Sequence, residues 1–223
     1  MNTNDDHDCP PEVIKRVESM DLTSSDNSML FSWIEENSKQ ECVVQCVAIV
    51  ASRLDNTCDL QVIGDFCEAA ATYAKFFEPE AKQQIKDAYL RFGYDASIAI
   101  QYFNGLRYNQ IDVRTHLKGE IKEDWSFTRP RRDAATWHYY LYLASLKSPD
   151  AYVALAEKLA DTKDGNDATN LIKSLADVKT KQTKNILLKY KEDERHSDGP
   201  VGPGPTIAET VEALLPTFPE YDS

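Results

Sequence analysis

A basic and aromatic cluster marks the middle of the chain. Arg129, Arg131 and Arg132 lie within four residues of one another, and Trp125 and Phe127 come just before them. Guanidinium groups pair with phosphates, and aromatic rings stack on unpaired bases. Nucleic-acid binding is therefore one of the functions that the sequence predicts.

A second basic stretch would extend that surface. Between residues 173 and 191 the chain has six lysines and a single acid, Asp177. The lysines expected to contact nucleic acid are Lys179, Lys181 and Lys184. This interpretation requires them to share one surface with the three arginines. Each group also has a structural explanation. The arginines could pair with nearby acids at the start of a helix, and the lysines could lie on a solvent-exposed helix face.

Two cysteines one helical turn apart, Cys42 and Cys46, have a spacing that could supply two sulfur ligands to a metal. They stand in an apolar run, where small core side chains are the simpler interpretation, so we expect no metal site. The chain has five cysteines, all in its first third. An odd number does not fit a secreted disulfide framework, and we expect an intracellular protein.

The sequence carries no catalytic motif. A Gly-rich phosphate loop, a nucleophile elbow, a zinc-protease helix and a calcium loop are all absent. His116 and Glu120 have the spacing of an acid and a base on one helix face, but a solvated helix end explains them as well. We expect no catalytic residue, no cofactor and no enzyme.

The formal net charge of −12 is concentrated at the two ends of the chain. Residues 1–27 carry −5 and residues 192–223 carry −7, so the middle is neutral overall. We expect 1–26 to be an acidic, mostly disordered segment, 192–205 to be a Gly/Pro linker and 206–223 to be an acidic amphipathic tail. No apolar run reaches the roughly 18 residues of a membrane span, so no membrane partner is expected.

Between these ends, the spacing of apolar residues predicts an all-α fold. We expect a single bundle of about seven or eight helices over residues 27–191, with flexible acidic termini. Residues 165–191 are expected to be one long final helix. Residues 79–104 could form a helix–turn–helix, whose second helix would expose Ser97, Gln101 and Asn104 with Arg107 behind them. The sequence shows no internal repeat of solenoid length.

The C-terminal tail indicates another function. Its apolar residues, Ile207, Val211, Leu214, Leu215 and Phe218, follow the expected linker at helical spacing. Such a segment is typical of a peptide that docks on a partner, although it could equally pack on its own bundle. We therefore predict a non-enzymatic binding protein that acts through protein–protein contacts or self-association. The alternative is a nucleic-acid-binding regulator or helical coat protein.

Overall fold

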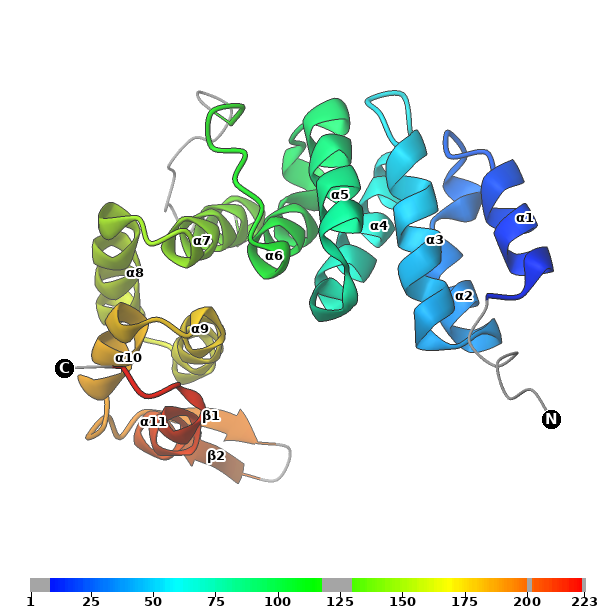
Figure 1. Ribbon diagram of the computed structural model, residues 1–223. Coiled ribbons are helices and arrows are strands. Elements are labelled where there is room, and N and C mark those ends of the chain that lie inside the picture. Colours follow the sequence, from blue (N-terminus) through cyan, green and yellow to red (C-terminus); the bar gives the residue numbers. More distant parts are fainter. Residues whose placement is uncertain (1–8, 118–129, 200–201, 222–223) are drawn as a thin grey trace. The chain divides into compact units, whose positions relative to one another are not determined.

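The computed structural model describes residues 9–117, 130–199 and 202–221, and the chain divides into two compact units (Figure 1). Unit 1 comprises Met1–His138 and unit 2 comprises Tyr139–Ser223. The described residues form eleven α-helices and one β-hairpin. The mostly α-helical class is confirmed, although the helices outnumber the expected seven or eight. Among the described helices, none has the length and apolar character needed to cross a membrane.

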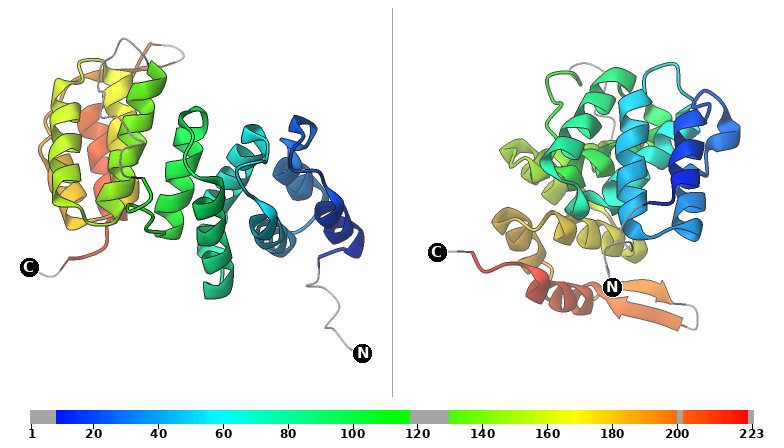
Figure 2. Two further views of the ribbon diagram at one scale, coloured as in Figure 1. Left: turned by 90° about the horizontal axis from the view of Figure 1, so that it is seen from above. Right: turned by 45° about the vertical axis from the view of Figure 1, so that its right-hand side comes forward.

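Six consecutive α-helices make up most of unit 1. They are α1 (Pro11–Ser19), α2 (Leu30–Asn37), α3 (Gln40–Arg53), α4 (Leu60–Thr72), α5 (Pro79–Phe92) and α6 (Ala99–Asn109). The helices α1, α3 and α5 contact one another in that order, and so do α2, α4 and α6 (Figures 1 and 2). Unit 1 is therefore a two-layer stack in which each helix pair rests on the pair before it, as in repeat proteins.

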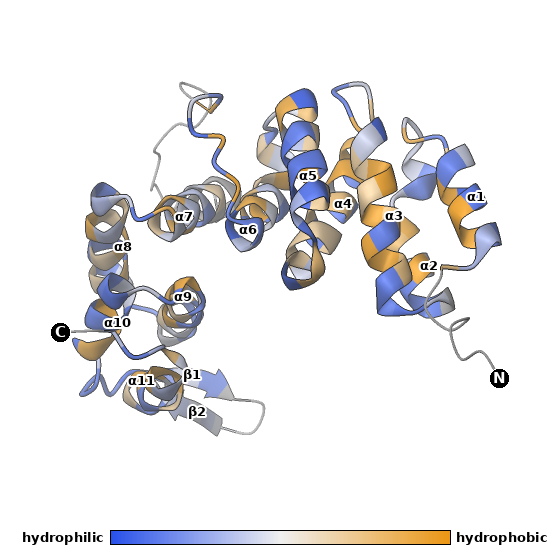
Figure 3. Cartoon of the chain, viewed as in Figure 1, coloured by the Kyte–Doolittle hydropathy of each residue, from blue (hydrophilic) through white to orange (hydrophobic). Residues whose placement is uncertain are grey.

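An aromatic cluster joins α4, α5 and α6. Phe66, Tyr89, Phe92 and Tyr102 are all buried, and their neighbouring ring centroids lie 5.0–6.1 Å apart. Pairs at this separation are stabilised by ring quadrupoles as well as by burial. Figure 3 shows apolar residues continuing along α3, which packs between α1 and α5. The apolar spacing in the sequence thus corresponds to the interior of the stack.

The helix α6 lies against α4 at Gly105. A Cβ atom built on Gly105 would lie 1.8 Å from the Tyr89 hydroxyl oxygen and 3.0 Å from the Cys67 carbonyl oxygen. A larger side chain would push α6 outward, so this position requires glycine. One turn later, the Asn109 amide donates to the carbonyl oxygens of Ala70 at 2.7 Å and Gly105 at 2.9 Å. The bond to Ala70 ties α6 to α4, whereas the bond to Gly105 lies within α6.

Unit 2 is built around α9. Its elements are the C-terminal half of α7 (Pro130–Ser145), α8 (Pro149–Asp161), α9 (Gly165–Val178), α10 (Lys181–Leu188), β1 (His196–Gly199), β2 (Gly202–Thr206) and α11 (Ile207–Leu214). Helix α9 contacts α8, α10, α11 and β1. Its Ile172 and Leu175 side chains are fully buried, so α9 supplies much of the core of this unit.

The single long helix expected over residues 165–191 is wrong, because the chain forms two helices there. Lys179 adopts the left-handed conformation, with φ of 50°, and ends α9. Thr180 then caps α10, and its hydroxyl accepts a hydrogen bond from the Thr183 N–H at 3.2 Å. The break falls in the stretch where the apolar spacing of the sequence lapses.

The segment expected to be a Gly/Pro linker contains the β-hairpin. Its strands are antiparallel, with His196 opposite Thr206. Asn166, in the first turn of α9, makes two hydrogen bonds to Asp198. Its amide nitrogen donates to the carboxylate and its Oδ1 accepts from the backbone N–H, both at 2.7 Å. The sequence indicated turns in this segment but not the strand pairing.

Arg195 anchors the start of the hairpin to the end of α8. Its guanidinium pairs with the Asp193 carboxylate at 2.5 Å and donates to the Thr162 carbonyl oxygen. The hydrogen bonds from Arg195 lower the pKa of the Asp193 carboxyl. After the hairpin, Thr206 and Glu209 form a capping box that starts α11. The C-terminal segment is thus connected to α8 and α9 through a short, hydrogen-bonded path.

Replacing Gly105 with alanine should lower the free energy of unfolding by roughly 2 kcal/mol or more, because the new methyl group would overlap the Tyr89 hydroxyl. Gly64→Ala on α4 is the matched control. Its Cβ would find its nearest neighbour, Ile98 Cγ2, at 3.3 Å, so its effect should stay within about 1 kcal/mol. Urea unfolding followed by circular dichroism measures both. Equal losses would contradict the close-packing argument.

Replacing Gly165 with alanine should loosen the hairpin, since a Cβ atom there would lie 1.8 Å from the His196 carbonyl oxygen. Hydrogen exchange measured by mass spectrometry should accelerate about tenfold or more over residues 196–206. Asn166→Ala removes only the two hydrogen bonds to Asp198 and should give a smaller acceleration. If the glycine variant exchanges like the wild type, α9 does not fix the hairpin in the way described.

Candidate functional site

The arginine and aromatic cluster predicted to contact nucleic acid is described only in part. Arg129, Trp125 and Phe127 lie outside the described residues. Arg131 and Arg132 belong to the first turn of α7 in unit 1, and only their helical backbone is described. Their role in binding stays a prediction.

The three predicted lysines belong to unit 2, at the junction of α9 and α10. Lys179 and Lys181 are exposed, and Lys184 is partly buried. Tyr221 lies over this junction: its hydroxyl donates to the Lys179 carbonyl oxygen at 2.6 Å, and the Lys184 Nζ is 5.8 Å from its ring centroid. Because lysines and arginines fall in different units, a shared surface also stays a prediction.

The apolar residues predicted to dock on a partner are largely covered by unit 2 itself. Ile207, Val211 and Phe218 are buried, while Leu214 and Leu215 are partly buried. Helix α11, which carries Ile207, Val211 and Leu214, packs on α9 and β2. A partner could reach the buried side chains only after α11 leaves α9.

Three cysteine sulfurs gather where the chain enters α1. A disulfide joins Cys9 to Cys42 on α3, and the Cys46 sulfur lies within 4.8 Å of both. All three side chains are buried, and burial raises the pKa of the Cys46 thiol to about 11. The sequence placed Cys42 and Cys46 in the core but gave no sign of the pairing with Cys9. A metal could use this sulfur set only after the disulfide is reduced.

Only one member of the candidate acid–base pair is described. His116 is exposed, and its Nδ1 lies 3.2 Å from the hydroxyl of the neighbouring Thr115. Residues 111–117 form turns rather than a helix, and Glu120 lies outside the described residues. The chain up to residue 117 therefore forms no helix on which His116 and Glu120 could share a face.

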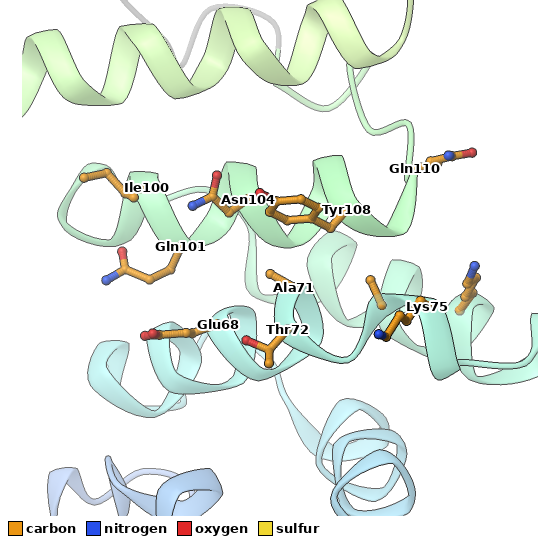
Figure 4. Close-up of a pocket in the computed structure, with 11 residues that line it drawn as sticks. Glu68, Ala71, Thr72, Lys75, Ile100, Gln101, Asn104, Tyr108 and Gln110 are labelled. Carbon is orange, nitrogen blue, oxygen red and sulfur yellow. The ribbon is translucent and has the colours of Figure 1, made fainter. Parts of the chain in front are cut away.

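A pocket of about 840 Å³ opens on unit 1 between α4 and α6 (Figure 4). Polar side chains line it: Glu68 and Thr72 of α4 and Lys75 of the 3₁₀ turn after α4 on one wall, and Gln101, Asn104 and Tyr108 of α6 on the other. The α4 pair and the α6 set each recur every three or four residues and so each lies along one helix face. Because Gly105 brings α6 close to α4, the two faces form opposing walls. Ala71 and Ala74 add apolar surface between them.

Two further polar side chains stand behind the α6 wall. His138 Nδ1 lies 3.0 Å from Asn104 Oδ1. Since an amide oxygen only accepts, Nδ1 carries the proton, and the Asn104 amide nitrogen remains available to the pocket. The Arg107 Nη2 donates to the Tyr108 hydroxyl at 2.8 Å, and the Arg107 Cζ lies 4.5 Å from the Tyr108 ring centroid. Both contacts connect the pocket wall to the interior.

Arg107 has an unusual environment for a guanidinium. It is only 7% exposed, and its Nε and Nη1 have no hydrogen-bond partner within the described part of the chain. Buried cations are normally paired with an anion or fully hydrogen-bonded. Two strong donors therefore remain unsatisfied directly behind Tyr108.

The electrostatics differ between the two ends of the pocket. Burial and, to a smaller extent, the charge of Arg107 together lower the pKa of His138 to about 4, so His138 is neutral at pH 7. Beside Glu68, burial together with the charges of Glu68 and Glu35 raises the pKa of the Asp65 carboxyl to about 6. The Glu68 end of the pocket is thus acidic, whereas Arg107 makes the Tyr108 end basic.

Comparison with known proteins adds no guide to this site, since no protein-family model, curated protein or solved structure matches the chain. The sequence pointed to part of the pocket, because it placed Gln101 and Asn104 on an exposed helix face with Arg107 behind. It missed Glu68, Thr72 and Lys75. Their signal is faint: three polar positions at helical spacing in an otherwise apolar run.

The depressed pKa of His138 gives a pH test. The unfolded chain takes up a proton near the ordinary pKa of 6.5, whereas the folded chain resists until about pH 4. The free energy of unfolding should therefore fall as the pH drops through this range, by up to roughly 3 kcal/mol from this group. His138→Gln keeps a donor for Asn104 and should remove that fall. Thermal unfolding from pH 7 to about 4 measures both proteins, and parallel pH curves would contradict the prediction.

Proposed function

We propose that this chain is a non-enzymatic binding protein that acts through protein–protein contacts and holds an extended segment of its partner in the pocket between α4 and α6. The observation that carries the proposal is the opposed pair of polar helix faces lining that pocket (Figure 4). Its volume of about 840 Å³ falls within the range of ligand sites. The following properties of the walls support a peptide as the occupant.

The side chains on the walls suit a peptide backbone. The amides of Gln101 and Asn104 can each donate and accept, so one side chain can pair with both an N–H and a C=O group. The Thr72 hydroxyl on the opposite wall has the same double capacity. An extended segment leaves its backbone groups free for such bonds, unlike a helix.

Part of the spacing along α6 fits an extended chain. Residues on the same side of an extended strand recur every 6.6 to 7 Å, roughly. At a rise of about 1.5 Å per residue, Asn104 and Tyr108 are about 6 Å apart along the helix axis, so they can meet successive same-side positions of a bound segment. Gln101 and Asn104 are only about 4.5 Å apart, which is shorter than this repeat.

The pocket is held in shape without a ligand. The contact at Gly105 and the hydrogen bond from Asn109 to Ala70 fix α6 on α4, and the aromatic cluster ties α6 to α5. A site that needs little rearrangement avoids part of the entropic cost of binding. The C-terminal segment lends less support to this function, because its apolar residues already pack within unit 2.

Peptide selection tests the proposal. Full-length protein would be used to select binders from a displayed library of random peptides about 12 residues long. Each selected peptide would then be measured by fluorescence anisotropy against the wild type and Thr72→Ala/Gln101→Ala, which removes one polar group from each wall. We expect this variant to lose about tenfold or more in affinity.

The matched control is Gln45→Ala/Gln84→Ala, which removes two exposed amides of unit 1 that do not line the pocket. Its affinity should stay within about twofold of the wild type. Circular dichroism would confirm that both variants keep their helices. Peptides that bind all three proteins equally well, or a library that yields no binder, would refute the proposed function.

A further inference from the structure

The charges of the pocket are sorted along its length. In Figure 4, Glu68, Gln101 and Ile100 lie toward one end, and Lys75, Tyr108 and Gln110 lie toward the other. Lys82 of α5 also lines the pocket. Neither lysine has an ion pair within the described residues, so both ammonium groups remain available to a ligand.

The buried guanidinium of Arg107 adds a cation at the Lys75 end. It contacts the Tyr108 hydroxyl and ring, and Tyr108 lines the pocket. The unsatisfied Nε and Nη1 of Arg107 therefore stand one side chain away from the pocket. A carboxylate suits this guanidinium because its two oxygens match the guanidinium fork, which pairs Nη2 with either Nε or Nη1.

We propose that the pocket is selective for an acidic segment of a partner protein, with one carboxylate held at the end formed by Lys75 and Tyr108, where it reaches Arg107. The inference rests on the proposed function and adds the chemistry of the occupant. Two features support an anion at this end: the cations of Lys75 and Arg107 there and the acidic pair Glu68 and Asp65 near the other end. A segment with its acid at one end would thus bind in one direction.

Because Arg107 is buried behind Tyr108, a carboxylate can contact its guanidinium only if the Tyr108 side chain turns aside. The Tyr108 side chain is 42% exposed, so it is the part of this wall with room to turn. Its rotation would exchange the hydroxyl contact of Arg107 for a carboxylate. Such an exchange replaces a neutral acceptor with a charged one, and charge-assisted hydrogen bonds are roughly twice as strong.

Three synthetic peptides test the preference. Each is amidated, about ten residues long, and alternates alanine with glutamate, glutamine or lysine. All carry the same uncharged dye, and fluorescence anisotropy is measured with full-length protein at about 20 mM and about 150 mM salt. We expect the glutamate peptide to bind about tenfold tighter than the glutamine peptide and the lysine peptide to bind most weakly.

Two charge-matched variants locate the effect. Lys75→Gln/Lys82→Gln removes two cations from the pocket, and Lys173→Gln/Lys189→Gln removes two exposed cations from unit 2. The ratio between glutamate and glutamine peptides should fall below about threefold in the first variant and stay near the wild-type value in the second. A similar fall in both would show that net charge alone, rather than the pocket, causes the preference and would overturn the proposal.

Contact between the carboxylate and Arg107 can be measured separately by NMR. In a ¹⁵N–¹H spectrum, the Nε–H signal of Arg107 should move when the glutamate peptide saturates the protein and should stay in place with the glutamine peptide. A signal that does not move with the glutamate peptide would refute the role of Arg107.

The outcomes separate the two proposals. Equal affinity for the glutamate and glutamine peptides, with both weakened in Thr72→Ala/Gln101→Ala, would preserve the peptide-binding function and refute the acidic preference. Absence of binding by the glutamate peptide at low salt would also refute the preference, whereas pocket-dependent binding of library peptides would still support the function. If no peptide of any kind depends on the pocket, both proposals fail.

Discussion

The close approach of α6 to α4 at Gly105 is the contact on which the rest of unit 1 depends. It places the Tyr89 hydroxyl against the α6 backbone and lets Asn109 reach across to the Ala70 carbonyl oxygen. The same contact aligns Gln101, Asn104 and Tyr108 opposite the polar face of α4. The pocket is therefore a consequence of helix packing, and a change that widens this contact would alter both the stability and the spacing of the pocket walls.

Behind that wall, unit 1 buries polar groups that a stable core would not need. Arg107 leaves two donors unsatisfied, and burial keeps His138 neutral at a pH where an exposed histidine begins to titrate. Both features lower the stability of the free protein. A ligand that supplies an anion to Arg107 would recover part of that loss, so binding and stability should rise together. This link favours an explanation of Arg107 through the pocket over one through folding alone.

The sequence predicted local structure well where side-chain periodicity decides it and poorly where tertiary contacts do. The apolar spacing at Phe66 and Tyr89 identified helices, and their side chains do form the core. The break at Lys179 and the pairing of the hairpin strands depend on a left-handed residue and on Asn166, which no periodicity reports. The α6 wall of the pocket could be predicted from the sequence, because Gln101 and Asn104 are polar residues on one face of a predicted helix. The α4 wall could not be predicted, because only the tertiary fold brings it opposite α6.

The C-terminal segment illustrates why composition alone misleads about interfaces. A Gly/Pro-rich stretch followed by an amphipathic helix is typical of a docking peptide, yet Arg195 and Asn166 attach this stretch to α8 and α9. Gly165 has no Cβ, and only that allows the His196 carbonyl oxygen to lie against the start of α9. With the hairpin held there, Ile207 and Val211 enter the core of unit 2, and the cost of exposing them opposes any partner that would use them. Among the described residues, no side chain fills the polar pocket of unit 1 in this way, so the proposed partner segment would bind there without unfolding either unit.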